Sequence, residues 1–177
     1  MNLKSMLAAM AVFGAAIALL VFATQREEKR ATPEAGVLPA HLFMSEGPAS
    51  VSDIAEARKT AKVGDRVAVR GRIGGSKSPF VAGRAVFLLM DVNVPNCIEN
   101  HNPGCPTPWD FCCAPREQRL AGAATVQVVG TDGLPVKAAL EGVGGLSPLR
   151  QVVVEGNVLQ TADGLVIGAT ALYVPPQ

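Results

Sequence analysis

The sequence predicts an all-β fold, a five-stranded Greek-key barrel with short helices, preceded by an N-terminal membrane helix. Short apolar runs separated by turn residues recur along the chain, and a helix-like segment falls between the third and the fourth of them. A Cys-rich insertion separates the second run from the third. The chain has 177 residues, 49% hydrophobic and 18% charged, which suits one modest globular domain and excludes an intrinsically disordered chain.

The pattern of charged and apolar residues at the N-terminus indicates a targeting segment. A short positive start, Met1 to Lys4, precedes an uncharged run from Met6 to Ala23. At about 1.5 Å per residue this run reaches roughly 27 Å, close to the hydrocarbon thickness of a bilayer. We expect residues 1–24 to be a retained signal anchor, or a signal peptide cleaved after Ala23. Either form places the domain in the bacterial periplasm, on the inner membrane or released from it, and a cytoplasmic domain on a reversed anchor is the alternative.

A linker and a short helix come next. Residues 25–50 contain several prolines and glycines and little periodicity, so they read as a linker, and the domain is expected over 51–177. Asp53 and Glu56 have the spacing of a capping pair at the start of a short helix. That helix should end before Gly64.

Five apolar runs predict the strands of the barrel. In the first, Val67, Val69 and Ile73 alternate with arginines, which is the pattern of a half-buried strand. An Asp-Gly pair between the last two runs predicts a hairpin turn. The predicted strands are Arg66 to Ile73, Ala85 to Val92, Ala124 to Gly130, Arg150 to Gln160 and Leu165 to Val174, and a short helix is expected at Val136 to Glu141.

Two segments carry a resemblance to a known fold family. The run from Val63 to Ile73 resembles the opening strand of OB-fold domains, and Val152 to Val158 followed by Leu165 to Ala169 resembles their last hairpin. The likeness covers roughly Ala57 to Val174 and implies a barrel with exposed loops, not an activity. It suggests an OB-fold domain of an exported or membrane-anchored bacterial protein. Gly71 and Gly156 would then lie at tight bends of the sheet.

All four cysteines fall inside the irregular stretch 93–122. In an oxidising compartment the favoured interpretation is two disulfides. Cys112 and Cys113 are adjacent in the sequence, and a bond between them would strain the intervening peptide, so each would pair with Cys97 or Cys105. A zinc or copper(I) site that adds His101 is the alternative, although the spacing lacks the two-residue gap of common zinc motifs. A redox-active pair of Cys112 and Cys113 is a third interpretation.

Two further groups are candidate binding surfaces. Arg66, Arg70 and Arg72 share one face of a predicted strand, in a stretch where acidic residues are scarce, and such a face suits single-stranded nucleic acid or anionic lipid. Trp109 and Phe111 lie among the cysteines and either pack the loop on the barrel or offer an aromatic contact surface.

No acid–base or nucleophile arrangement is recognisable, so we do not expect an enzyme. The leading hypothesis is a non-enzymatic OB-fold binding module of the cell envelope, with a disulfide-stapled Cys-rich loop, no cofactor, and an envelope protein or small ligand as its partner. Metal handling with zinc or copper, or thiol redox chemistry, in the same loop is the alternative. Single-stranded nucleic-acid binding through the basic strand face ranks third, and the net charge of +1 gives it no support.

Overall fold

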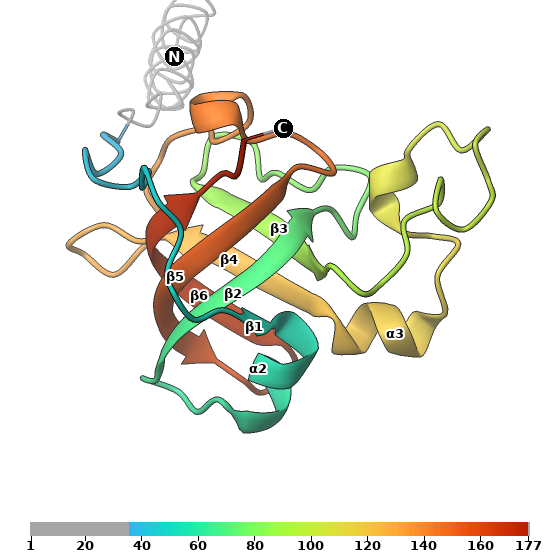
Figure 1. The fold of residues 1–177 in the computed structure, drawn as a ribbon. Coiled ribbons are helices and arrows are strands. Elements are labelled where there is room, and N and C mark those ends of the chain that lie inside the picture. The colour runs from blue at the N-terminus through green and yellow to red at the C-terminus, as the bar shows by residue number, and fades with distance from the viewer. Residues whose placement is uncertain (1–35, 177) are drawn as a thin grey trace, which may run out of the picture. The chain divides into compact units, whose positions relative to one another are not determined.

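A closed five-stranded β-barrel of mixed strand direction is the centre of the computed structural model, which describes residues 36–176 (Figure 1). Neighbouring strands follow the order β2-β3-β4-β6-β5, and β5 pairs back with β2 to close the barrel. Among these pairs β4 and β6 run parallel and the others antiparallel. The predicted all-β barrel is confirmed, and it is compatible with an OB-like fold. Its strands are β2 (Arg66–Ile73), β3 (Val86–Asp91), β4 (Ala123–Val128), β5 (Gln151–Gln160) and β6 (Leu165–Tyr173).

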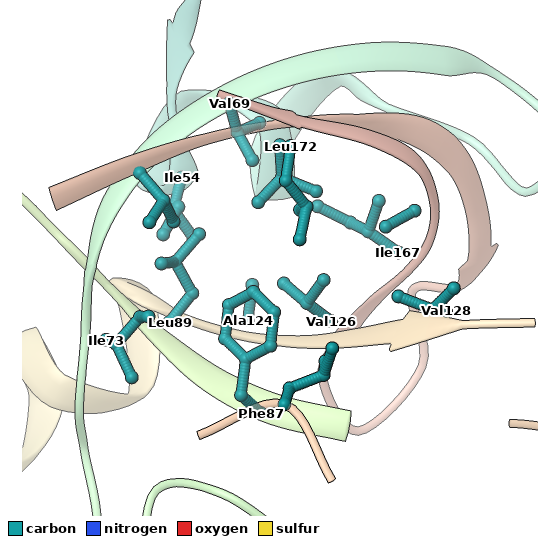
Figure 2. Packing of buried hydrophobic residues seen from close by; sticks show 14 of the residues in the cluster. Ile54, Val69, Ile73, Phe87, Leu89, Ala124, Val126, Val128, Ile167 and Leu172 are labelled. Atoms are coloured by element: carbon teal, nitrogen blue, oxygen red, sulfur yellow. The ribbon is translucent and has the colours of Figure 1, made fainter. Parts of the chain in front are cut away.

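Alternate residues of these strands fill the barrel interior (Figure 2). Phe87 and Leu89 of β3 are fully buried, and Val126 of β4 and Ile167 of β6 are buried with them. Burying an aliphatic or aromatic side chain of this size contributes about 1.5–3 kcal/mol, so the interior is the main source of stability. The period-two alternation that predicts β2 arises from this one-sided burial.

Two glycines lie where strands approach closely. Gly71 pairs with both Asp91 of β3 and Val152 of β5, and a Cβ there would collide with Leu89 and with the carbonyl oxygen of Met90. Gly156 lies at a register shift of β5, and a Cβ there would collide with the carbonyl oxygen of Gly168. Gly156 therefore lies at an irregularity of the sheet, in line with the expected bend, whereas a bend at Gly71 stays a prediction.

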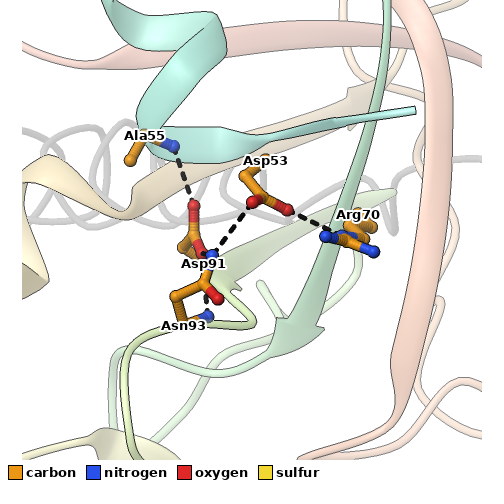
Figure 3. Close-up of polar contacts among 5 residues, drawn as sticks. All are labelled: Asp53, Ala55, Arg70, Asp91 and Asn93. Carbon is orange, nitrogen blue, oxygen red and sulfur yellow. Dashed lines mark hydrogen bonds and ion pairs between the residues drawn. The ribbon is translucent and has the colours of Figure 1, made fainter. Parts of the chain in front are cut away.

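A short helix, α2 (Ile54–Thr60), covers one end of the barrel, as expected. The predicted capping pair is wrong, because Asp53 makes no side-chain cap. Asp91, buried at the end of β3, accepts the N–H of Ala55 at 2.8 Å instead (Figure 3). A carboxylate from a distant strand therefore satisfies the helix N-terminus and ties α2 to the barrel.

The Asp53 carboxylate points away from the helix and joins a polar network instead (Figure 3). Its Oδ1 accepts Arg70 Nε at 2.6 Å, and its Oδ2 accepts the amide of Asn93 at 3.0 Å. Asp53 also belongs to the two-residue strand β1 (Ser52–Asp53), which runs parallel to β2. The need to pair with Arg70 explains why this side chain is not free to cap α2.

The residues just before β1 belong to the folded unit. Leu42 is fully buried in the core, and the N–H of Met44 donates to the carbonyl oxygen of Leu172 at 2.8 Å. The compact unit extends over Ala35–Gln177. The second half of the segment interpreted as a linker thus adds a short pairing to β6.

The helix expected at 136–141 is wrong. The N–H of Val136 donates to the carbonyl oxygen of Val128, and the carbonyl of Val136 accepts the N–H of Ala85. Val136 thus connects β4 with the residue directly before β3, and only a single turn, η2 (Val143–Gly145), follows. Tertiary pairing therefore overrides the local helical pattern.

The predicted N-terminal membrane helix, at residues 1–24, lies outside the described residues. Within residues 36–176, no helix combines the length and the apolar character that crossing a bilayer requires.

Candidate functional site: a cluster of cysteines

The Cys-rich insertion lies between β3 and β4, as predicted, and extends to one side of the barrel in Figure 1. It contains two elements that the sequence pattern does not reveal, the single turn η1 (Pro108–Asp110) and the helix α3 (Arg116–Ala121). The segment is therefore folded and packs around a small apolar core of its own. That core contains Met90, Val94, Phe111 and Ala114.

The loop docks on the end of β2 through the backbone. The N–H of Gly75 donates to the carbonyl oxygen of Trp109 at 2.8 Å, and Trp109 Nε1 donates to the carbonyl oxygen of Lys77 at 3.0 Å. A Cβ on Gly74 would collide with the Trp109 carbonyl and lie 2.6 Å from Cε2 of Phe111. Only glycine at position 74 leaves room for this contact.

A polar turn fixes the chain on the N-terminal side of Cys97. The buried Asn96 accepts the N–H groups of Ile98 at 2.9 Å and Glu99 at 3.1 Å. Glu99 Oε2 accepts Arg72 Nη1 at 2.7 Å and the N–H of Asn96 at 3.0 Å. The salt bridge therefore connects the cysteine loop to β2.

Asp110 fixes the other side of the cluster. Its Oδ1 accepts the N–H of Cys112 at 2.9 Å, and its Oδ2 accepts the hydroxyl of Thr107 at 2.9 Å. Burial by itself raises the pKa of Asp110, but the hydrogen bonds from Cys112 and Thr107 and the charge of Lys77 outweigh it, so the pKa lies below its usual value. This carboxyl is ionised at neutral pH and directs the turn that places Cys112.

The sulfur atoms converge in one place. Cys97 Sγ lies 3.5 Å from Cys112 Sγ, and Cys112 Sγ lies 3.9 Å from Cys113 Sγ. Ligand atoms of Cys97, Cys105, Asp110 and Cys112 all lie within 4.8 Å of one another, so this group could hold a metal ion. Cys97 is buried, Cys105 and Cys113 are half-buried, and Cys112 is exposed. The cluster therefore opens to solvent at Cys112.

These distances differ from those of the disulfide interpretation. All four cysteines are free, and a disulfide would bring two sulfurs to about 2.05 Å. In a tetrahedral zinc site with Zn–S bonds near 2.3 Å, neighbouring sulfurs are roughly 3.8 Å apart. The 3.5 Å and 3.9 Å separations match this second geometry.

Burial and neighbouring groups shift the pKa values of three of the thiols in different directions. Burial raises the pKa of Cys97, and the Asp110 carboxylate followed by Cys97 raises that of Cys112. Contacts from Cys97 and the Asn102 amide lower the pKa of Cys113. A divalent cation among these sulfurs would supply the positive charge that stabilises all of the thiolates together.

The other candidate residues lie elsewhere. His101 is exposed, with a φ of 58°, and is not in the converging group found among residues 36–176. Phe111 is fully buried beneath the loop. The three arginines of the predicted basic face each meet a carboxylate, in the pairs Arg66–Glu155, Arg70–Asp53 and Arg72–Glu99.

Trp109, which is half-buried, also lines a cleft beside the loop. The cleft has a volume of about 330 Å³ and is lined by mostly apolar residues from three segments of the chain. They include Pro79 and Phe80 before β3, and Leu140 and Pro148 before β5. The cysteine loop thus supplies one wall of a concave surface.

Asp110 and Gly74 are the residues that sequence reasoning missed. Asp110 stands two positions before Cys112, the spacing at which an aspartate accepts an N–H in a turn, and this was the available signal. For Gly74 the sequence offers only a Gly-Gly pair after a strand. No protein-family model matches the chain, and no curated protein matches it significantly.

Proposed function

We propose that this protein is a zinc-binding, OB-like module in which one Zn²⁺ ion holds the cysteine loop together. The observation that carries the proposal is the convergence of sulfur atoms at tetrahedral spacing, 3.5 Å and 3.9 Å apart. Thiolates select soft or borderline cations, and Zn²⁺ suits a tetrahedral set of sulfur ligands.

Cys97, Cys105 and Cys112 are three of the proposed ligands. We assign Cys113 as the fourth in place of Asp110, although Asp110 and not Cys113 belongs to the group whose ligand atoms all lie within 4.8 Å of one another. Both Asp110 oxygens already accept hydrogen bonds, which favours a positioning role for this carboxylate. The sulfur of Cys113, by contrast, contacts Cys112 Sγ at 3.9 Å and the Asn102 amide at 3.5 Å. An N–H near a sulfur is the usual outer-shell partner of a metal-bound thiolate.

The proposed role of the ion is structural. Four protein ligands leave no open position at which water or substrate could be activated. The ion would instead fix the loop, and with it the Trp109 wall of the cleft. This favours a non-enzymatic binding module over a metal-dependent hydrolase.

Elemental analysis of the full chain, purified with mild detergent and without added reductant or chelator, tests the proposal. We expect one zinc per chain, and four titratable thiols once the metal is removed. Intact mass is measured on the same sample. A mass lower by about 4 Da with no metal would mean two disulfides and would overturn the proposal in favour of a disulfide-stapled loop.

The cleft beside Trp109 favours a second role, the binding of a small apolar ligand. Its volume of about 330 Å³ lies at the lower end of the range for small-molecule sites. Trp109 is the only tryptophan, so energy transfer from its indole to an anilinonaphthalene sulfonate dye reports binding at this wall. We expect saturable transfer in the folded protein, and its absence would contradict this role.

A further inference from the structure

We propose that the cysteine cluster is also a redox switch, in which oxidation joins Cys97 to Cys112 and releases the metal. This inference rests on the proposed zinc site and adds a means of regulating it. The oxidant is a hydroperoxide such as hydrogen peroxide, and a dithiol reverses the reaction.

The arrangement of the two sulfurs assigns their roles. Cys112 is exposed, so a solvent oxidant meets it first, whereas Cys97 is buried directly behind it with the two sulfurs 3.5 Å apart. A movement of about 1.5 Å brings them to bonding distance. The bound zinc would keep both sulfurs as thiolates, so Cys112 is the attacking thiolate and Cys97 the resolving one.

Cys113 is a poorer partner for Cys112 although its sulfur is only 3.9 Å away. A bond between neighbouring residues strains the intervening peptide. The backbone of Cys113 is also tethered, because its carbonyl oxygen accepts the Asn100 amide at 2.7 Å. These contacts favour Cys97 over Cys113 as the partner, and the sulfur of Cys97 is also the closer of the two to that of Cys112, at 3.5 Å, while Cys105 lies in the same group within 4.8 Å.

The chemistry balances in two steps. The Cys112 thiolate attacks one oxygen of hydrogen peroxide, the O–O bond breaks, and the departing hydroxide takes a proton from solvent to give water and a sulfenic acid. The Cys97 thiolate then attacks the Cys112 sulfur, the S–O bond breaks, and the second hydroxide leaves and is protonated. Two electrons pass from the two sulfurs to the peroxide. The zinc keeps its oxidation state but loses two of its four ligands.

Loss of these two zinc ligands would also change the wall of the cleft that Trp109 forms. The N–H of Cys97 donates to the carbonyl oxygen of Pro108 at 3.3 Å, next to Trp109, and the N–H of Cys112 donates to Asp110 on the other side. The backbone N–H groups of both cysteines therefore donate hydrogen bonds to the turn η1, which contains Trp109. Movement of the pair should change the environment of the indole.

The test is titration of the zinc-loaded full chain with hydrogen peroxide. Zinc release is followed with a chromogenic chelator, and the disulfide is mapped by peptide mass spectrometry. We expect one zinc released per disulfide, with Cys97 linked to Cys112, and restoration of the site by dithiothreitol with added zinc. Retention of zinc after oxidation, or a disulfide between other cysteines, would overturn the switch and leave the zinc site standing.

Two variants separate the steps. In Cys113→Ser the same Cys97–Cys112 disulfide should form, whereas a failure to form it would assign the resolving role to Cys113 and overturn the proposal. In Cys97→Ser oxidation should stop at Cys112, where dimedone captures the sulfenic acid, and an intramolecular disulfide in this variant would contradict the assignment. If the wild-type chain holds no metal before oxidation, the proposed function fails, and the switch fails with it.

Discussion

At the scale of single residues, two residues that contribute no sulfur decide whether the cysteine loop can form. Gly74 gives the loop space to approach β2, and Asp110 orders the turn that precedes Cys112. Neither was a candidate from the sequence, because close approach and carboxylate geometry are properties of the fold. The four cysteines were candidates, because residue type alone identifies them as ligands.

Gly74→Ala should loosen the loop. Its methyl group would collide with the Trp109 carbonyl and the ring of Phe111, which is fully buried and has little freedom to move. We expect a loss of about 1–3 kcal/mol in the free energy of unfolding, measured in urea and followed by Trp109 fluorescence. Gly104→Ala is the matched control, because a Cβ there meets nothing within 4 Å. Equal effects of the two substitutions would contradict the docking argument.

The ligand set is tested by a pair of substitutions. Asp110→Asn keeps an oxygen for the N–H of Cys112 and removes only the charge, so zinc should remain stoichiometric with an affinity about 10–100-fold lower. Cys113→Ser removes a proposed ligand and should weaken zinc binding further. Competition with a chelator of known affinity measures both. The reverse order would place Asp110 in the ligand set and Cys113 outside it.

At the scale of elements, apolar runs bounded by turn residues account for what could be predicted. The strands β2, β5 and β6 show regular apolar patterns, and their predicted and observed bounds agree to within one residue. The strand β1 is too short to carry a pattern, and the extended segment around Val136 resembles a helix in composition although its hydrogen bonds go to the barrel. Long-range pairing of this kind cannot be read from local sequence.

Substitution of Asp91 tests how the helix α2 is held on the barrel. Asp91 is only 1% exposed, and it accepts the N–H groups of Ala55 and Asn93 and the Asn93 amide. Asp91→Ala leaves these donors unpaired, so we expect a loss of about 3 kcal/mol in the free energy of unfolding. Urea denaturation measures the loss. A loss no larger than that of the neighbouring Asp53→Ala would contradict the role of Asp91 as a tertiary helix cap.

The pairing of Asp53 with Arg70 should give a small pH dependence. The hydrogen bond from Arg70 lowers the pKa of Asp53 in the folded state, although partial desolvation opposes the shift. The contribution is therefore present above the unfolded pKa, about 3.9, and is lost as the pH falls through the lower folded pKa. The destabilisation caused by Arg70→Ala should be small at pH 7, because solvent screens this pair, and should vanish near pH 2. A pH-independent difference between the wild type and this variant would rule out the charge pairing.

At the scale of the whole molecule, the described chain has two separate apolar cores. The barrel core is filled by strand residues, while the small core around Phe111 lies under the cysteine loop. The sequence predicts the first core from its periodicity. It predicts a crosslinked second region from the four cysteines, but spacing alone cannot distinguish disulfides from a metal, because it does not determine how far apart the sulfurs lie.

Removal of the metal should separate these two cores. With a reductant present to prevent disulfide formation, an excess of a strong chelator should leave the β signal in far-ultraviolet circular dichroism unchanged, because the barrel core contains none of the proposed ligands. Trp109 fluorescence should shift to longer wavelength as the loop releases the indole from Lys77. Zinc held at a free concentration of 100 times its Kd stabilises the folded state by about 2.7 kcal/mol, so the melting temperature should fall by several degrees when it is removed. Re-addition of zinc should restore both signals, and complete unfolding on chelation would mean that the loop and the barrel form one cooperative unit.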